Sequence, residues 1–288
     1  MLRQRVITAV VLLAILLPAL FAGTPAPFIA LTLVLIGAAA WEWARLVGVA
    51  GAGAQATGLL CAGICAALWW GGAVERPLPL LWTAAALAWV LGGGWLIGRG
   101  VAGWPRVPRW LRWAGGVAAL CAAWLAMAQA RRIGVNFLLS VLVLVWAADV
   151  FAYFSGRALG GRLTGGRKLA PAISPGKSWE GVWGGMLGVL GVAALWVWLD
   201  GAHATGSASL YTRLHQGGWW LLVLGAVFLS AMSVVGDLAE SLVKRSAGVK
   251  DSSRLLPGHG GVLDRIDALL PALPLAMMLV SLTPGAGA

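Results

Sequence analysis

Residues 137–149 read FLLSVLVLVWAAD, an almost unbroken apolar stretch that ends on a carboxylate. Apolar residues continue on either side of it, so the run covers about residues 134–157. A helix needs about 20 mostly apolar residues to cross a hydrocarbon core of about 30 Å. The stretch therefore predicts a membrane-spanning helix that carries Asp149 near one end.

Eight similar runs accompany this one along the 288-residue chain. The nine predicted spans cover residues 6–22, 28–47, 56–74, 78–97, 111–130, 134–157, 179–199, 217–245 and 263–282. Only 11% of the residues are charged, against about 25% in an ordinary soluble domain, and the mean hydropathy is +0.86. This composition excludes a soluble globular enzyme, a disordered chain and a coiled coil. It predicts an all-α polytopic membrane protein with about nine transmembrane helices.

Basic residues set the predicted orientation. If the N-terminus lies in the cytoplasm, the segments on that side hold 17 Lys and Arg residues and those on the other side hold 4. The positive-inside rule therefore favours a cytoplasmic N-terminus, with the outer pair Arg131–Arg132 as the one feature against it. The first run follows Arg3 and Arg5, as a cleaved signal peptide would. Its apolar stretch is long for such a signal, so we expect a retained first helix.

Acidic residues divide the chain into two regions. Eight of the ten Asp and Glu residues lie at or after Asp149. We therefore expect an N-terminal transmembrane scaffold of five helices in residues 1–132, and a catalytic transmembrane region of four helices with cytoplasmic loops in residues 133–288. The net charge is +11, and the charged residues lie between the apolar runs. It indicates anionic lipid, phosphorylated substrates or the cytoplasmic leaflet as partners, and no nucleic acid.

Asp149 is followed at helical spacing by Tyr153, Gly156 and Arg157, which fall on the same face. A carboxylate within a span costs about 2.5–3.5 kcal/mol on insertion scales, so its presence requires an explanation. One interpretation is a structural Asp149–Arg157 pair that closes the helix end. The other, which we favour, is a group that lines a polar cavity.

The connection after this helix, residues 156–181, reads GRALGGRLTGGRKLAPAISPGKSWEG. It combines five basic residues with six glycines before Lys177. Glycines let backbone N–H groups approach an anion, and Lys and Arg neutralise it. The composition fits a phosphate-binding loop and an ordinary positive-inside loop equally well. Ser178 and Glu180 are placed to cap the next helix and to supply its first-turn acid.

A second polar cluster occupies residues 237–267. Asp237, Glu240, Ser241 and Lys244 recur at helical spacing and form one stripe, and Asp264 and Asp267 open the last span. Mg²⁺ prefers carboxylate oxygens and keeps substrate phosphates in its shell. The cluster therefore predicts a divalent-cation site on Asp237, Asp264 and Asp267, although each piece also has a purely structural interpretation.

Residues 241–267, SLVKRSAGVKDSSRLLPGHGGVLDRID, resemble the signature of the CDP-diacylglycerol synthases, or phosphatidate cytidylyltransferases. All of the fixed positions of that signature are present in this chain. The resemblance extends to Asp149, Tyr153, Gly156, Arg157, Pro171, Ser174, Pro175, Lys177, Trp179, Glu180 and Gly181, whereas Ser178 stands where the family usually has Thr. The resemblance is strong over about residues 145–270. In the residues before 145, only the hydropathy pattern resembles that of the family.

The resemblance implies an integral enzyme of the bacterial inner membrane that converts CTP and phosphatidic acid into CDP-diacylglycerol and pyrophosphate on the cytoplasmic side. It also implies Mg²⁺ held between Asp237 and Asp264, membrane lipid around the enzyme, and a homodimer; a second, monovalent cation is a further option. The expected catalytic residues are Asp237, Ser241, Lys244, Arg245, Lys250, Asp251, His259, Asp264, Arg265 and Asp267. The expected substrate-binding residues are Asp149, Tyr153, Arg157, Ser174, Lys177, Ser178, Glu180, Arg254, Gly258, Gly260 and Gly261.

Two other functions remain as alternatives. A transporter for an anionic solute would be expected to show inverted repeats and broken helices in both halves, and the sequence contains no internal repeat. A different lipid-headgroup transferase is disfavoured because the CDP-alcohol phosphotransferase pattern DGxxAR…GxxxDxxxD is absent. Release of pyrophosphate from CTP on addition of phosphatidate distinguishes the enzyme from a transporter.

Overall fold

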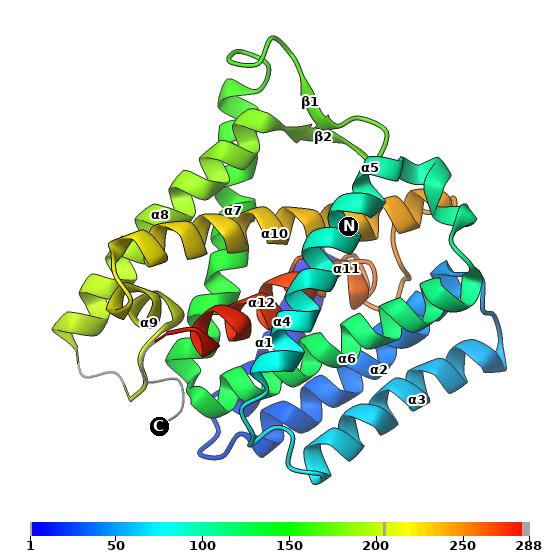
Figure 1. Cartoon of the computed structure of the whole chain (residues 1–288). Helices are drawn as coiled ribbons and strands as arrows, with labels where there is room; N and C mark the ends of the chain where they lie inside the picture. Colours follow the sequence, from blue (N-terminus) through cyan, green and yellow to red (C-terminus); the bar gives the residue numbers. More distant parts are fainter. Residues whose placement is uncertain (1, 204–205, 284–288) are drawn as a thin grey trace.

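Helices form most of the chain in the computed structural model, which describes residues 2–203 and 206–283 (Figure 1). Within those residues, eight helices are long and apolar enough to cross a membrane. They are α1 (Leu2–Leu20), α2 (Ala26–Leu46), α3 (Ala52–Trp70), a composite helix (Pro79–Arg106), α6 (Arg109–Ile133), α7 (Val135–Leu159), α8 (Trp179–Ala202) and α10 (Trp219–Ser246). Each coincides with one of the first eight predicted spans, which confirms the all-α polytopic class.

The fourth of these helices changes its winding along its length. It consists of α4 (Pro79–Leu87), the π-helical turn η1 (Ala88–Gly93), α5 (Gly94–Gly103) and the 3₁₀ turn η2 (Trp104–Arg106). A π-helical turn is rare and frequently lies at a functional site. Gly100 adopts a φ of +66°, a conformation suited to glycine, and bends α5 there.

The ninth predicted span, residues 263–282, is two short helices instead of one long helix. α11 (Leu263–Ile266) and α12 (Leu269–Ser281) are separated by a turn at Asp267 and Ala268. The 13 residues of α12 rise about 20 Å, less than a hydrocarbon core of about 30 Å. Most of them are buried against α4, α6 and α10. An apolar run predicts burial without distinguishing lipid from protein, and the expectation of nine spans is not confirmed.

A β-hairpin lies between α7 and α8, in a connection for which the sequence predicted only a loop. β1 (Lys168–Ala170) pairs antiparallel with β2 (Ser174–Ser178), with Lys168 opposite Ser178 and Ala170 opposite Ser174 (Figure 1). β2 leads directly into α8, whose first turn is capped as predicted, because Ser178 Oγ accepts a hydrogen bond from Gly181 N at 3.2 Å. The short helix α9 (Leu210–Gln216) connects α8 to α10.

α7 and α8 pack closely because glycines of α8 face α7. A Cβ atom on Gly185 would lie 2.8 Å from the carbonyl oxygen of Ala148, and one on Gly181 would lie 3.0 Å from that of Ala152. Small residues permit this close approach between membrane helices. The contact holds the end of α7 that carries Asp149, Tyr153 and Arg157 beside β2.

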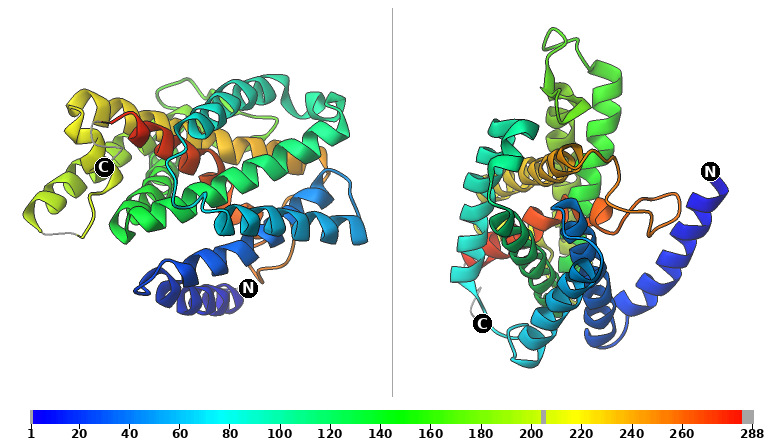
Figure 2. Two further views of the ribbon diagram at one scale, coloured as in Figure 1. Left: turned by 60° about the horizontal axis from the view of Figure 1, so that its bottom comes forward. Right: turned by 90° about the vertical axis from the view of Figure 1, so that its right-hand side faces the viewer.

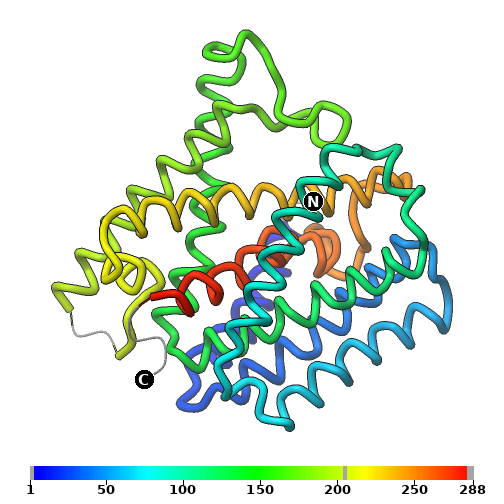
Figure 3. Tube along the Cα trace, in the orientation of Figure 1, coloured from blue at the N-terminus to red at the C-terminus, as the bar shows by residue number. Residues whose placement is uncertain are grey.

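Helices from the two predicted regions are interleaved. α12 packs against α4 and α6, and α10 packs against α5 (Figure 3). Figure 2 shows α1 along one side of the bundle, with its N-terminal end beside the loop that follows α10. There Thr8 Oγ1 donates a hydrogen bond to the carbonyl oxygen of Pro257 at 2.9 Å. Residues 1–132 therefore contribute directly to the surroundings of the C-terminal polar cluster.

Candidate active site

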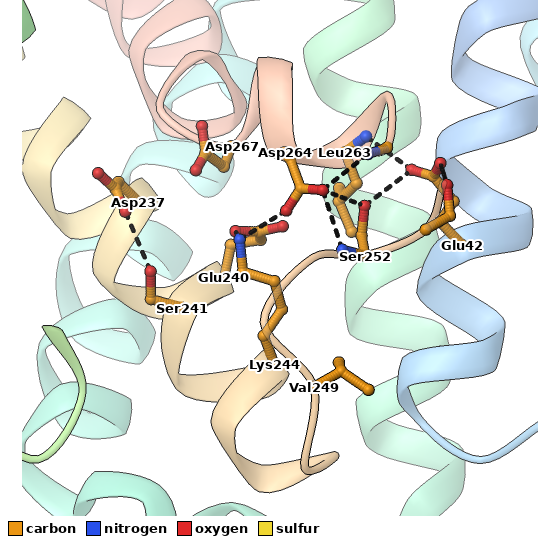
Figure 4. Close-up of polar contacts among 12 residues, drawn as sticks. Glu42, Asp237, Glu240, Ser241, Lys244, Val249, Ser252, Leu263, Asp264 and Asp267 are labelled. Atoms are coloured by element: carbon orange, nitrogen blue, oxygen red, sulfur yellow. Dashed lines mark hydrogen bonds and ion pairs between the residues drawn. The ribbon is translucent and has the colours of Figure 1, made fainter. Parts of the chain in front are cut away.

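The end of α10 and the start of α11 bring the predicted polar cluster together (Figure 4). Lys244 Nζ lies 2.6 Å from Asp264 Oδ1 and also pairs with Glu240 one helical turn away. Ser241 Oγ donates a hydrogen bond to Asp237 Oδ1 at 3.1 Å. The predicted stripe on α10 is confirmed, and Lys244 joins it to the second acidic segment.

Both carboxylate oxygens of Asp264 accept hydrogen bonds, Oδ1 from Lys244 and Oδ2 from the loop after α10. Its Oδ2 atom accepts hydrogen bonds from Ser252 N and Ser252 Oγ, both at 2.9 Å, and from Gly261 N at 2.8 Å. Burial alone would raise the pKa of Asp264, but the hydrogen bonds from Lys244 and Gly261 outweigh it and lower that pKa to about 2. Asp264 is therefore a fixed negative charge at neutral pH.

Glycine is required where the loop turns back toward Asp264. Gly260 adopts a φ of +84°, and a Cβ atom there would lie 2.6 Å from Asp264 Oδ2. A side chain at this position would displace the carboxylate. The glycine run in the signature therefore serves the loop conformation that presents Asp264.

Glu42, on α2, anchors the same loop from the N-terminal half of the chain. Its side chain is fully buried. Its carboxylate accepts hydrogen bonds from the hydroxyls of Ser252 at 3.2 Å and Ser253 at 2.5 Å, and from the backbone N–H groups of Val262 at 3.0 Å and Leu263 at 2.7 Å. Glu42 was not among the predicted site residues. The available signal was an acidic residue inside an apolar run, which needs partners when it is buried.

A polar cavity of about 470 Å³ lies between α7, β2, α8 and α10. Five of the expected substrate-binding residues line it: Asp149, Tyr153, Arg157, Lys177 and Ser178. Arg157 Nη1 donates to the Tyr153 hydroxyl at 3.2 Å, and within residues 2–203 and 206–283 no ion pair joins Arg157 to Asp149. The cavity-lining interpretation of Asp149 is therefore the one that the structure supports.

Lys177 connects this cavity to the carboxylates of α10. Lys177 Nζ lies 2.6 Å from Asp237 Oδ2, and Asp149 interacts electrostatically with both of them. The hairpin thus places a cation from the α7–α8 connection against the first acidic residue of the stripe. Asp149, Tyr153, Arg157 and Lys177, four of the expected substrate-binding residues, thus line one cavity, and Lys177 joins that cavity to Asp237.

Glu180 stabilises the glycine-rich loop and is absent from the lining of the polar cavity. Its Oε1 atom accepts hydrogen bonds from the backbone N–H groups of Gly161, Leu163 and Thr164 and from the Thr164 hydroxyl, at 2.7–3.3 Å. Ser174 is likewise absent from that lining and belongs to the hairpin. Both residues therefore shape the segment that carries Lys177.

The remaining signature residues lie at the end of α10, on the loop that follows it and on α11. Within the described residues, no hydrogen bond or ion pair joins the carboxylates to the exposed side chains of Arg245, Lys250, Asp251, Arg254 and Arg265. The buried Nδ1 atom of His259 has no hydrogen-bond partner among the described residues. Gly258 lies against Arg5 of α1. These groups surround the cluster without contacting its carboxylates.

Comparison with known proteins identifies the family. The sequence profile of the cytidylyltransferase family matches residues 3–283 of this chain. The chain belongs to the cytidylyltransferase family. It is 40% identical over 287 residues, 97% of either chain, to the phosphatidate cytidylyltransferase of Pseudomonas aeruginosa. It is 50% identical to that of Haemophilus influenzae over 141 residues, 49% of this chain, and 46% identical to that of Brucella abortus over 142 residues, also 49% of this chain. The resemblance found in the sequence is confirmed.

The chemistry of the donor set in this cytidylyltransferase fits a divalent cation. Carboxylate oxygens are supplied by Asp237, Glu240, Asp264 and Asp267, and Glu240 Oε1 is buried without a hydrogen-bond partner among the described residues. Burial, and then the negative charge of Asp237, raise the pKa of Asp267. A cation placed among these groups would relieve that repulsion.

The three predicted metal ligands are not assembled around a single point. Within residues 2–203 and 206–283, the one group of three or more His, Cys, Asp or Glu side chains whose ligand atoms all lie within 4.8 Å of one another is Cys61, Cys65 and Cys121. The carboxylates of Asp237 and Asp264 contact the ammonium groups of Lys177 and Lys244. Binding of a metal ion by all three aspartates therefore requires side-chain movement.

The three cysteines lie elsewhere in the bundle, on α3 and α6. All three are free and buried, with 3.6 Å between the sulfur atoms of Cys61 and Cys121. Their grouping was not predicted, because it depends on how α3 packs against α6.

Proposed function

We propose that this chain is a phosphatidate cytidylyltransferase, which transfers CMP from CTP to phosphatidic acid and forms CDP-diacylglycerol and pyrophosphate in phospholipid biosynthesis. The observation that carries the proposal is the convergence of Lys177, Lys244 and the acidic residues beside a polar cavity. The family and the 40% identical relative support the same reaction. No internal repeat supports the alternative of a transporter.

In the reaction, a phosphate oxygen of phosphatidate attacks the α-phosphorus of CTP. A new P–O bond forms while the bond to the β-phosphate oxygen breaks, and pyrophosphate leaves with the electron pair. The second pKa of a phosphate monoester is about 6, so this nucleophile is ionised at neutral pH without a general base. The task of the protein is to bring two polyanions together and to stabilise the charge that moves to the leaving group.

Cationic side chains of the site perform this task in our proposal. Lys177 and Arg157 line the polar cavity and bind phosphate oxygens there. Lys244, fixed by Glu240 and Asp264, is placed to neutralise charge on the transferring group. Arg245, Lys250, Arg254 and Arg265 surround the entrance for the nucleotide, and His259 with the neighbouring glycine N–H groups faces the leaving pyrophosphate.

Asp237, Asp264 and Asp267 are the residues that we propose to hold Mg²⁺, with Ser241 and Asp251 in support. When bound, Mg²⁺ would neutralise phosphate charge and orient the triphosphate. Lys177 and Lys244 would then be released from their carboxylates and become available to the phosphates. The carboxylates thus keep two ammonium groups in place before the substrates bind.

We also propose that the enzyme lies in the bacterial inner membrane as a homodimer, with its site on the cytoplasmic side. The asymmetry of 17 against 4 basic residues supports the orientation. A cytoplasmic site would give CTP direct access, while phosphatidate would arrive from the surrounding bilayer.

An assay of the detergent-solubilised protein with labelled CTP tests the proposed function. We expect pyrophosphate and labelled CDP-diacylglycerol only when phosphatidate and Mg²⁺ are both present. Pyrophosphate release that is independent of phosphatidate, or binding of CTP without turnover, would contradict the proposal.

A further inference from the structure

A second cavity, of about 530 Å³, lies between the composite helix Pro79–Arg106, α6 and α10. Its walls are made almost entirely of alanine, glycine, leucine and tryptophan side chains. The π-helical turn η1 forms part of the wall through Ala88, Trp89, Gly92 and Gly93. The cavity is therefore an apolar space, in contrast to the polar cavity described above.

The two cavities lie on different faces of α10. Val234 lines the polar cavity and Gly236 lines the apolar one. Two residues correspond to about 200° around a helix with 3.6 residues per turn. Glu240 belongs to the apolar cavity and also contacts Lys244, so this cavity adjoins the acidic cluster. A ligand in the apolar cavity would thus end beside the site of reaction.

Three buried polar atoms of the apolar cavity have no hydrogen-bond partner in the described part of the chain. They are Trp104 Nε1, Arg112 Nε and Glu240 Oε1. The Arg112 guanidinium lies 5.6 Å from the centre of the Trp104 ring, so the two donors are at the same end of the cavity. Buried donors without partners are rare in native proteins and require an explanation. A ligand with acceptor oxygens at one end and an apolar remainder would satisfy the two donors, Trp104 Nε1 and Arg112 Nε.

The length of the cavity matches one leaflet of a bilayer. Its α6 wall extends from Leu111 to Ala122, which corresponds to about 16 Å along the helix. This is about half of a hydrocarbon core of about 30 Å. Trp104 and Arg112 lie at the α6 N-terminal end, the end that the basic residues predict to be cytoplasmic.

We propose that this cavity holds one acyl chain of phosphatidate, with its ester carbonyl bound by Trp104 Nε1 and its headgroup drawn toward Arg112. The inference deepens the proposed function and rests on it. Complementarity of charge and of polarity selects the ligand: the cation faces the anionic headgroup, the free donor faces the ester, and the alanine and glycine wall faces the chain. The phosphate group of phosphatidate then reaches the polar stripe of α10 from the side opposite to the nucleotide.

Filling the inner part of the cavity tests the position of the chain. Ala85 and Ala119 line it on α4 and α6, and both are half-buried. We expect Ala85→Leu and Ala119→Leu to raise the KM for dioleoyl phosphatidate about tenfold. The KM for dihexanoyl phosphatidate and that for CTP should remain unchanged, since short chains do not reach the added side chains. Ala67→Leu, at an exposed position on α3, is the matched control and should alter none of these constants.

The outcomes separate this inference from the proposed function. Absence of CDP-diacylglycerol formation by the wild-type protein would contradict the function itself. Normal turnover by the wild type with equal effects on long and short chains, or with no effect, would overturn the acyl-chain site alone. A change from dimer to monomer in the filled variants without dependence on chain length would assign the cavity to a second copy of the chain instead.

The ester contact has a separate test. Trp104→Phe keeps an aromatic ring, smaller than the indole, and removes the Nε1 donor. We expect the KM for diacyl phosphatidate to rise about fivefold, the effect of one neutral hydrogen bond, while the KM for the ether-linked analogue stays constant. Photolabelling with phosphatidate that carries a diazirine at the chain end should modify residues 81–88 or 118–122, the part of the cavity wall away from Arg112. Labelling of the polar cavity, or equal effects of Trp104→Phe on ester and ether lipids, would overturn the proposal.

Discussion

Lys177 Nζ lies 2.6 Å from Asp237 Oδ2, so a lysine of the β-hairpin is paired with the first carboxylate of the α10 stripe. The pair connects two segments separated by about sixty residues of helix and loop. In the proposed reaction, Asp237 would release this ammonium group when it holds Mg²⁺, and Lys177 would then be available to the triphosphate. In this proposal the contact precedes substrate binding, and that can be tested directly.

Replacement of Lys177 by Met should lower kcat/KM for CTP by at least about tenfold, because one hydrogen bond to a charged group contributes about 1.5–3 kcal/mol. The Mg²⁺ concentration for half-maximal activity should fall at the same time, because the lysine no longer competes for Asp237. Steady-state assays at varied CTP and Mg²⁺ measure both quantities. Lys168→Met, at an exposed position on the paired strand, is the control. An unchanged Mg²⁺ dependence would show that Lys177 and the cation do not share Asp237.

Replacement of Asp264 by Asn should reduce kcat by about 100-fold, comparable to the loss of one group that stabilises transition-state charge. The amide would neither fix Lys244 nor bind a divalent ion well. Glu75→Gln, in an exposed ion pair with Arg132 far from the site, should retain full activity. CTP-dependent pyrophosphate release at saturating Mg²⁺ is the measurement. Activity near the wild-type level in folded Asp264→Asn would remove this residue from the proposed role.

Replacement of Glu42 by Gln should loosen the signature loop. The amide offers one acceptor where the carboxylate accepts from two serine hydroxyls and two backbone N–H groups. We expect the free energy of unfolding to fall by about 2 kcal/mol, within the usual cost of leaving buried donors unpaired. Protease cleavage in the loop at residues 254–258, most of which are exposed, should accelerate. Equal cleavage rates in Glu42→Gln and the wild type would contradict an anchoring role.

The depressed pKa of Asp264 predicts a dependence of stability on pH. Its folded value of about 2 lies below its ordinary value of 3.8, so its stabilising contribution is complete above about pH 4 and is lost as the pH falls toward 2. The difference in melting temperature between the wild type and Asp264→Asn should therefore be largest near pH 5 and shrink toward pH 2.5. A difference that stays constant across this range would be inconsistent with an ionised, hydrogen-bonded Asp264.

The positions of the spans and the α10 stripe followed from the sequence because they depend on local spacing. Asp237, Ser241 and Lys244 share a face through helical periodicity, and a bond between Ser241 and Asp237 requires no knowledge of distant contacts. The signature residues 241–267 likewise indicated the reaction by resemblance. These features do not depend on how the helices pack.

Contacts between distant segments could not be predicted in this way. Glu42 reaches Ser252 across 210 positions of sequence, and nothing in its own run indicates which loop it serves. Residues 263–282 were expected to form one membrane-spanning helix, yet residues 269–281 form a short helix that is largely surrounded by other helices. The lysines that occupy Asp237 and Asp264 were expected near phosphates, and only the folded geometry reveals that the carboxylates hold them.

The placement of α10 between two unlike cavities has a kinetic consequence. The water-soluble nucleotide and the membrane lipid would bind in separate cavities. Both substrates can therefore be bound at the same time, and no product has to leave before the second substrate binds. Initial-rate plots in which CTP is varied at several fixed phosphatidate concentrations should therefore give intersecting lines, the pattern of a ternary complex, and parallel lines should not appear.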